Sequence, residues 1–118
     1  AADTVVHLEG RPYAKPDDDD DAARMLRELS GVWHHVTTGV AIARAGEVRS
    51  FRVTTDVRFR NLSDAEIARY VATGEPHDKA GAYGIQGLGG ALVAEVRGDW
   101  TNVMGLPLEA TLKALEAL

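Results

Sequence analysis

Apolar and polar residues alternate most regularly in two stretches near the middle of the chain. Residues 33–45 are rich in valine, threonine and isoleucine, and residues 51–59 place an apolar residue or a threonine at every second position. A period of two is typical of strands with one buried face. The Ala45-Gly46-Glu47 segment between them indicates a hairpin turn. Together the two stretches predict a long antiparallel ribbon.

The N-terminal part of the chain predicts a shorter strand pair. Residues 4–8 form an apolar run rich in valine, Glu9-Gly10 is a turn signal, and residues 11–15 are expected to return as a second strand. Asp3 therefore stands at the end of a strand.

Two helices are indicated by their apolar spacing and by their first turns. The first follows Pro16 and five aspartates, residues 17–21, whose carboxylates favour a helix N-terminus; the run lacks the glycine and the distal glutamate of an EF-hand calcium loop. The second begins with the capping box of Ser63 and Glu66 and ends at Gly74. The apolar faces consist of Ala22, Met25, Leu26 and Leu29 in the first helix and of Ile67, Tyr70 and Val71 in the second.

The C-terminal part predicts a second hairpin and a last helix. Residues 91–96 and 100–104 are the expected strands, joined by a tight turn at residues 97–99. Pro107 suits the first position of the last helix. The apolar residues of that helix are Leu108, Leu112, Leu115 and Leu118.

Residues 75–90 form a glycine-rich stretch with polar side chains. They hold five of the chain's twelve glycines and its only glutamine, and such a stretch lets the backbone approach a ligand closely. Lys79 suits a point-charge grip on phosphate oxygens. Gln86 has the donor and acceptor needed to read the edge of a base, or it only satisfies backbone groups of the loop. Tyr83 is expected to be a packing anchor.

Asp3 and Lys15 are further candidates for chemistry. Asp3 could bind a metal or act as a general base that activates water, although an aspartate beside a threonine at a strand end is often a local cap. Lys15, followed by the rigid Pro16, suits a phosphate contact, whereas most lysines are solvated surface groups. His34 and His35 point to opposite faces of a strand, so they cannot both bind one ion.

Composition narrows the classes of protein. The 118 residues fit one domain with its own core. The absence of cysteine excludes disulfides and thiolate metal sites and favours a reducing, cytoplasmic setting. A formal net charge of −5 argues against a nucleic-acid partner, and no apolar run has the length of a membrane span. P-loop, nucleophile-elbow and zincin motifs are also absent.

Several sequence blocks carry a family resemblance. In chain order they are Ala-Asp-Thr-Val-Val (2–6), Lys15-Pro16, residues 25–31, residues 38–40, residues 55–59, residues 70–76, residues 78–87 and residues 103–108. Together they resemble the Maf family of nucleoside triphosphate pyrophosphatases, and the resemblance covers the whole chain. The most specific block is Asp-Lys-Ala-Gly-Ala-Tyr-Gly-Ile-Gln-Gly at residues 78–87. Its Tyr-Gly-Ile-Gln form is similar to the branch that acts on dTTP and UTP.

The resemblance implies a reaction and a role for five residues. The family splits nucleoside triphosphates between the α and β phosphates with a divalent cation, Mg or Mn, and an attacking water. Asp3 matches the proton acceptor and is the expected metal ligand. Thr4 and Gln86 match positions that set nucleotide choice, while Lys15 and Lys79 match lysines near the phosphates. The expected fold is α/β, a mixed β-sheet with flanking helices, with a cleft between the Asp3 strand and residues 75–90.

One departure from the family pattern bears on completeness. Members of the family begin with a further segment bearing Ser-x-Ser-x-Arg-Arg, which grips the triphosphate, and this sequence starts at the Asp-Thr strand. We expect residues 1–118 to be the C-terminal part of a longer domain; a naturally short protein is the other interpretation. A sheet without its first strands exposes edges, which a homodimer would cover. The alternative functions are a 7-methyl-GTP pyrophosphatase and a catalytically inactive nucleotide-binding module.

Overall fold

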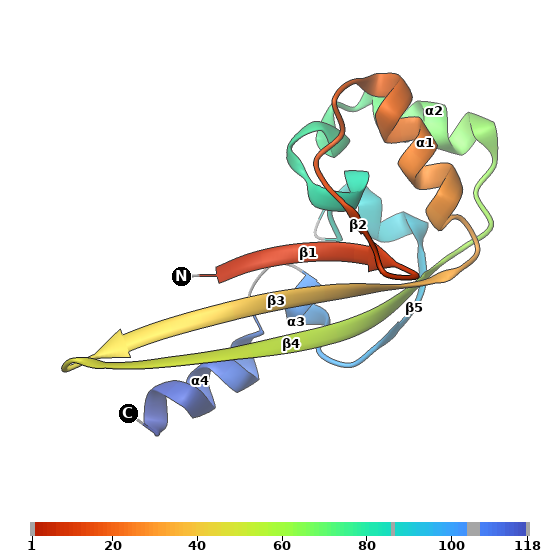
Figure 1. The fold of residues 1–118 in the computed structure, drawn as a ribbon. Helices are drawn as coiled ribbons and strands as arrows, with labels where there is room; N and C mark the ends of the chain where they lie inside the picture. The colour runs from red at the N-terminus through yellow and green to blue at the C-terminus, as the bar shows by residue number, and fades with distance from the viewer. Residues whose placement is uncertain (1, 86, 104–106, 118) are drawn as a thin grey trace.

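One five-stranded sheet organises the molecule. The computed structural model describes residues 2–85, 87–103 and 107–117. The strands are β1 (Ala2–Leu8), β2 (Arg11–Tyr13), β3 (Trp33–Arg44), β4 (Glu47–Phe59) and β5 (Val93–Arg97). They lie in the order β2-β1-β3-β4-β5. Figure 1 shows two helices packed together over one end of this sheet, while the β3-β4 ribbon extends away from them.

The expected α/β fold with flanking helices is confirmed, but the pairing differs from the mixed sheet that we expected. All four pairings among the described strands are antiparallel. The reason lies in the connections. The pairs β1-β2 and β3-β4 are joined by short turns, which only antiparallel neighbours allow, and the helical connection from β2 returns β3 antiparallel to β1.

The β3-β4 ribbon is the one that the alternating pattern predicted. Its register runs from Trp33 opposite Arg58 to Arg44 opposite Glu47. One face of β3 is buried and consists of His34, Val36, Thr38 and Val40. The face that alternates with it is more exposed, as expected for a sheet that packs its core on one side. On this more exposed face His35 pairs with Asp56, at 2.6 Å from Nδ1 to Oδ1.

Both predicted helices form, the first within its run of aspartates and the second at its capping box. Helix α1 (Asp19–Leu29) starts at Asp18, whose carboxylate accepts from the Asp21 amide at 2.7 Å. Helix α2 (Asp64–Ala72) starts at Ser63, whose hydroxyl accepts from the Glu66 amide at 3.1 Å. Their apolar faces pack with the sheet in one core cluster. It includes Val6, Tyr13, Ala22, Met25, Leu26, Leu29, Val36, Val57, Phe59, Ile67, Tyr70 and Val71.

The second predicted hairpin is wrong. Strand β5 forms, beginning two residues later than expected, but it pairs with β4, and its expected partner is the short helix α3 (Trp100–Val103). Asp99 starts this helix, because its Oδ1 accepts from the Thr101 amide at 2.9 Å. A local side-chain cap therefore overrides the strand preference of the valine and threonine in this segment. The last expected strand residue, Met104, lies outside the described residues.

Asn102 explains why α3 stays against the ribbon. Its side chain is fully buried, and its amide donates to the backbone oxygens of Val36 at 2.9 Å and Val53 at 2.8 Å. The residue thus docks α3 on β3 and β4 together.

The last helix is also present. Helix α4 (Leu108–Glu116) begins one residue after Pro107, which occupies the N-cap position. Three of its leucines are exposed, namely Leu108, Leu112 and Leu115. No helix among the described residues is long and apolar enough to cross a membrane.

Candidate functional site

The glycine-rich stretch after α2 folds as a chain of short 3₁₀ turns that lies against β1. The turns are η1 (Glu75–Asp78), η2 (Ala80–Ala82) and η3 (Leu88–Leu92). Gly81 sits closest to the sheet, with φ of +73° and only 2.8 Å between the position of an added Cβ and Val6 Cγ1. A side chain at this position would be strained by the backbone angle and would collide with β1. Gly81 therefore lets the loop close over the strand.

A cavity of about 550 Å³ lies between β1 and this loop. The sheet contributes Thr4, Val6 and Val36, and the loop contributes Lys79, Tyr83 and Gly84 among others. It lies where the sequence predicted a cleft. The lining combines apolar side chains with a few polar groups, which is the usual composition of a small-molecule site.

Thr4 and Lys79 are the two predicted site residues that the structure brings to this cavity. The Thr4 hydroxyl is hydrogen-bonded to the Thr38 hydroxyl across β1 and β3, at 3.0 Å. The Lys79 ammonium lies 3.4 Å from Asp78 Oδ1 and remains partly exposed. The lysine is therefore able to meet an anion at the cavity wall.

Asp3 does not line this cavity. Asp3 precedes Thr4 on β1, and successive side chains of a strand point to opposite faces. Its side chain is exposed and borders a second cavity of about 470 Å³, together with Gly39, Phe51 and Arg52. Gln86 lies outside the described residues. The roles expected for both residues stay predictions.

Lys15 lies apart from the cavity, in the connection between β2 and α1. Its side chain is exposed and borders a hollow of about 330 Å³ beside α1. A backbone hydrogen bond joins this connection to the loop that carries Lys79, because the Gly81 amide donates to the Ala14 oxygen at 3.3 Å. Lys15 and Lys79, the two lysines predicted to contact phosphates, thus lie on segments that are hydrogen-bonded to each other at Ala14, next to Lys15.

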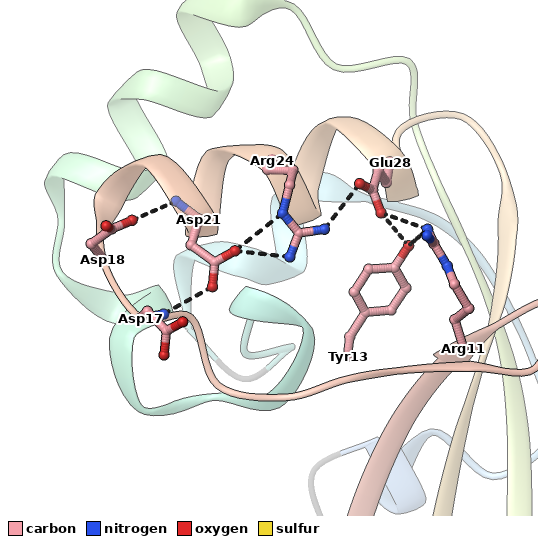
Figure 2. A network of polar contacts seen from close by, with 7 residues as sticks. All are labelled: Arg11, Tyr13, Asp17, Asp18, Asp21, Arg24 and Glu28. Atoms are coloured by element: carbon pink, nitrogen blue, oxygen red, sulfur yellow. Dashed lines mark hydrogen bonds and ion pairs between the residues drawn. The ribbon is translucent and has the colours of Figure 1, made fainter.

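Figure 2 shows the polar network that holds the Lys15 connection from the side of α1. Glu28 accepts from Tyr13 at 2.7 Å and from Arg11 at 2.9 Å, which fixes β2 to the helix. Arg24 then bridges Glu28 and Asp21. The Tyr13 hydrogen bond, opposed by partial burial and aided by Arg24 and Arg11, lowers the pKa of Glu28. The network therefore links the buried Tyr13 to charged side chains at the surface of α1.

Glu75 and Tyr70 organise the cavity wall, and sequence reasoning missed both. Burial opposes the ionisation of Glu75, yet hydrogen bonds from the Gly89 amide, the Tyr70 hydroxyl and the Leu88 amide outweigh it and lower the pKa of this carboxyl. Burial raises the pKa of Tyr70, so its hydroxyl keeps its proton. The signal was a lone glutamate at the start of a glycine-rich stretch, whose free backbone amides require an acceptor.

Contacts between His34 of β3 and Tyr83 of the loop fix the loop to the sheet. His34 Nε2 lies 2.8 Å from the Tyr83 hydroxyl, and both residues pack edge-to-face on Phe59. Burial, together with the nearby His35, lowers the pKa of His34 to about 4. The histidine is therefore neutral at pH 7. The expectation that Tyr83 is a packing anchor is confirmed, since the residue is buried in the core.

The described residues do not form a metal site by themselves. Among them, no group of three or more histidine, aspartate or glutamate side chains could hold an ion. Asp3 offers a single carboxylate, which is fewer than the several oxygen ligands that Mg²⁺ or Mn²⁺ requires. The ligand role expected for Asp3 accordingly stays a prediction.

Comparison with known proteins gives a consistent result. A family profile described as "Maf-like protein" matches residues 1–118. A protein of Halalkalibacterium halodurans named dTTP/UTP pyrophosphatase is 54% identical over 116 residues, which is 98% of this chain and 61% of the relative. Proteins of the same name from Escherichia coli O157:H7 and Chromobacterium violaceum are 54% and 53% identical, covering 97% and 94% of this chain. The chain spans about three fifths of the length of these relatives.

Proposed function

The chain belongs to the Maf-like protein family, and on that premise we propose that it forms part of a nucleoside triphosphate pyrophosphatase acting on dTTP and UTP. The observation that carries the proposal is the match to relatives of that name at 53–54% identity across nearly the whole chain. The cavity between β1 and residues 75–87 supports it, because it offers an apolar recess with polar groups at its walls.

The proposed reaction is a hydrolysis at the α phosphorus. A water oxygen forms the new bond to this phosphorus, and the bond from it to the bridging oxygen of the β phosphate breaks. The electron pair leaves with pyrophosphate, and the water proton passes to a carboxylate. The products are the nucleoside monophosphate and pyrophosphate.

The proposed roles follow from the chemistry of each residue. Asp3 takes the proton of the attacking water, since a carboxylate can serve as a general base. Lys79 and Lys15 stabilise negative charge that shifts to the departing phosphates. Thr4, with Gln86, selects the base.

A divalent cation is part of this proposal on the strength of the family resemblance. When bound, it would neutralise charge on the phosphates. Its test is direct: activity is expected to disappear when a chelator removes divalent ions and to return when Mg²⁺ or Mn²⁺ is added back. Full turnover in the chelator would remove the cation from the proposal.

The experiment that tests the function supplies single nucleotides to the natural gene product at its full length. We expect dTTP and UTP to yield dTMP or UMP and pyrophosphate, and 7-methyl-GTP to be a poor substrate by kcat/KM. Asp3→Asn should lower kcat by about a hundredfold or more, the range typical for loss of a general base. The product must be pyrophosphate, since release of single phosphates would indicate a different reaction.

A matched control keeps the Asp3 result interpretable. Asp64 is also exposed, and it lies at the first turn of α2, where it accepts a long hydrogen bond from Arg27. Asp64→Asn removes the same charge far along the chain from β1, and kcat is expected to stay near that of the wild type. Equal turnover by the wild type and Asp3→Asn would contradict the assigned base.

A further inference from the structure

The carboxylate of Glu75 is fully engaged by the loop that follows it. Its Oε1 accepts from the Tyr70 hydroxyl at 2.8 Å and from the Gly89 amide at 3.0 Å, and its Oε2 accepts from the Leu88 amide at 3.0 Å. Hydrogen bonds to an ionised acceptor are stronger than neutral ones. One side chain at the start of the loop thus holds the backbone thirteen and fourteen residues further on.

Tyr70 links the Glu75 carboxylate to an earlier part of the loop, at Gly84. Its hydroxyl donates to Glu75 and accepts from the Gly84 amide at 3.1 Å. Gly84 stands before the predicted base-reading position in the sequence, and Leu88 and Gly89 stand after it. The pair therefore ties the backbone on both sides of that position.

The glycines of the motif allow this close approach. A Cβ added at Gly87 would lie 2.7 Å from Cδ of Glu75, and one added at Gly89 would lie 2.6 Å from the Tyr70 hydroxyl oxygen. Real Cβ atoms do not approach other heavy atoms so closely. Gly87 and Gly89 are thus explained by the space that Glu75 and Tyr70 occupy, whereas a Cβ added at Gly84 would lie 2.7 Å from Cδ of Lys79.

A carboxylate is required here in preference to an amide of the same shape. Both oxygens of Glu75 accept from N–H or O–H donors. A glutamine has one acceptor oxygen, and its NH₂ group would face at least one of these donors in either orientation. The isosteric change Glu75→Gln therefore breaks part of the tie without removing bulk.

We propose that Glu75 and Tyr70 are positioning residues for nucleobase selection: they fix the cavity wall formed by Gly84, Ile85 and Gly87, so that the wall accepts a uracil or thymine base over cytosine. This inference rests on the proposed function. The wall residues border the cavity together with Thr4, whereas Asp3 does not. Loss of the tie is expected to act on selection and binding, with less effect on the chemical step.

The test compares UTP with CTP, which differ at the edge of the base. Glu75→Gln and Tyr70→Phe should each lower the ratio of kcat/KM for UTP to that for CTP by about tenfold, within the range that one contact contributes to discrimination. Most of the change should appear in KM. Glu66→Gln is the control, because Glu66 is a carboxylate on α2 that accepts from Arg60 and lies outside the loop; its ratio should equal that of the wild type.

A second measurement follows the hydrogen bonds between the Glu75–Tyr70 pair and the loop without any substrate. Hydrogen exchange of the Gly84, Leu88 and Gly89 amides should be faster in Glu75→Gln. In Tyr70→Phe the Gly84 amide should change most, since among the described residues it is the one amide that donates to the tyrosine. Tyr70→Phe removes a single oxygen, so it keeps the test available if Glu75→Gln does not fold.

The outcomes separate this inference from the proposed function. A wild-type protein that splits neither UTP nor dTTP would overturn the function, and hydrogen exchange alone would then decide whether the tie exists. An active wild type whose selectivity and amide exchange stay the same in both variants would overturn the positioning role. Lower selectivity with faster exchange in both variants supports it.

Discussion

Two tyrosine–glutamate pairs of nearly equal geometry hold different parts of the molecule. Tyr13 donates to Glu28 at 2.7 Å on the outside of α1, and Tyr70 donates to Glu75 at 2.8 Å beside the cavity. The remaining partners of Glu28 are arginine side chains, whereas those of Glu75 are backbone amides of the glycine-rich loop. The same pair thus joins side chains in one place and shapes the backbone in the other.

The difference teaches which contacts the fold can lose. Arg11 and Arg24 are 68% and 50% exposed, so water can replace Glu28 as their partner. The amides of Leu88 and Gly89 belong to a loop with few apolar side chains, and their position depends on the carboxylate that they meet. Glu75 is therefore expected to contribute more to local order than Glu28, although both have a lowered pKa.

The substitution expected to disrupt the Tyr70–Glu75 pair most strongly lies in the loop, at Gly89. Gly89→Ala would place a methyl group 2.6 Å from the Tyr70 hydroxyl and 2.5 Å from the Gly84 backbone oxygen. The backbone cannot yield as a flexible side chain would, so we expect a loss of about 3 kcal/mol in the free energy of unfolding, at the upper end for overpacking. Denaturant titration of the natural gene product measures it.

Gly39→Ala is the matched control for this substitution. Gly39 lies in β3, and an added Cβ there meets no atom within 4 Å. Its stability should stay near that of the wild type or rise slightly, since alanine restricts the unfolded chain. Equal losses in the two variants would mean that the effect at Gly89 does not come from the crowded loop.

Acid is expected to weaken the anchoring of the loop by way of His34. Its pKa in the folded state is about 4, against an ordinary value of 6.5. The unfolded chain therefore takes up a proton at higher pH than the folded one, and the stabilisation present above pH 6.5 is lost as the pH falls toward 4. Between pH 7 and pH 5 the loss should be about 2 kcal/mol.

The measurement is a series of denaturant titrations across this pH range. In His34→Gln, stability at pH 7 should be lower, because the buried contact to Tyr83 is altered, but its dependence on pH should be flatter. Near-ultraviolet circular dichroism would follow Tyr83 in the same series. A wild-type curve that stays level down to pH 5 would contradict the role assigned to His34.

The sequence predicted the parts of the fold whose signals are local and periodic. The period of two in residues 51–59, the aspartate run at residues 17–21 and the capping box of Ser63 and Glu66 each correspond to an element in the structure. Residues 100–104 were misread for two reasons. The local cap at Asp99 was overlooked, and the contacts that hold Asn102 against two strands join residues 49 and 66 positions apart, which no local pattern reveals.

The position of the candidate site could be predicted from the sequence, but the residues that hold its walls in place could be predicted less well. Thr4 and Lys79 meet at one cavity, as the prediction of a cleft beside residues 75–90 required. Alternation along β1 places Asp3 on the other face from Thr4, a separation that follows from their adjacency in a strand. Glu75 escaped notice because its partners are mostly backbone amides, which every residue except proline carries, so its place before a glycine-rich stretch was the only signal.

The smallest expected effect distinguishes the two pairs most sharply. Glu28→Ala leaves the exposed Arg11 and Arg24 to water and removes one acceptor of the Tyr13 hydroxyl, so the free energy of unfolding should fall by about 1 kcal/mol. Glu75→Ala leaves two backbone amides and the Tyr70 hydroxyl without their acceptor, and a loss of about 1–3 kcal/mol is expected. Parallel titrations at pH 7, repeated in high salt, compare them. Salt should reduce only the stability loss of Glu28→Ala, because screening weakens exposed ion pairs and leaves hydrogen bonds to backbone amides nearly unchanged. If Glu28→Ala lost as much stability as Glu75→Ala, and the loss were equally insensitive to salt, the two pairs would contribute to stability in the same way.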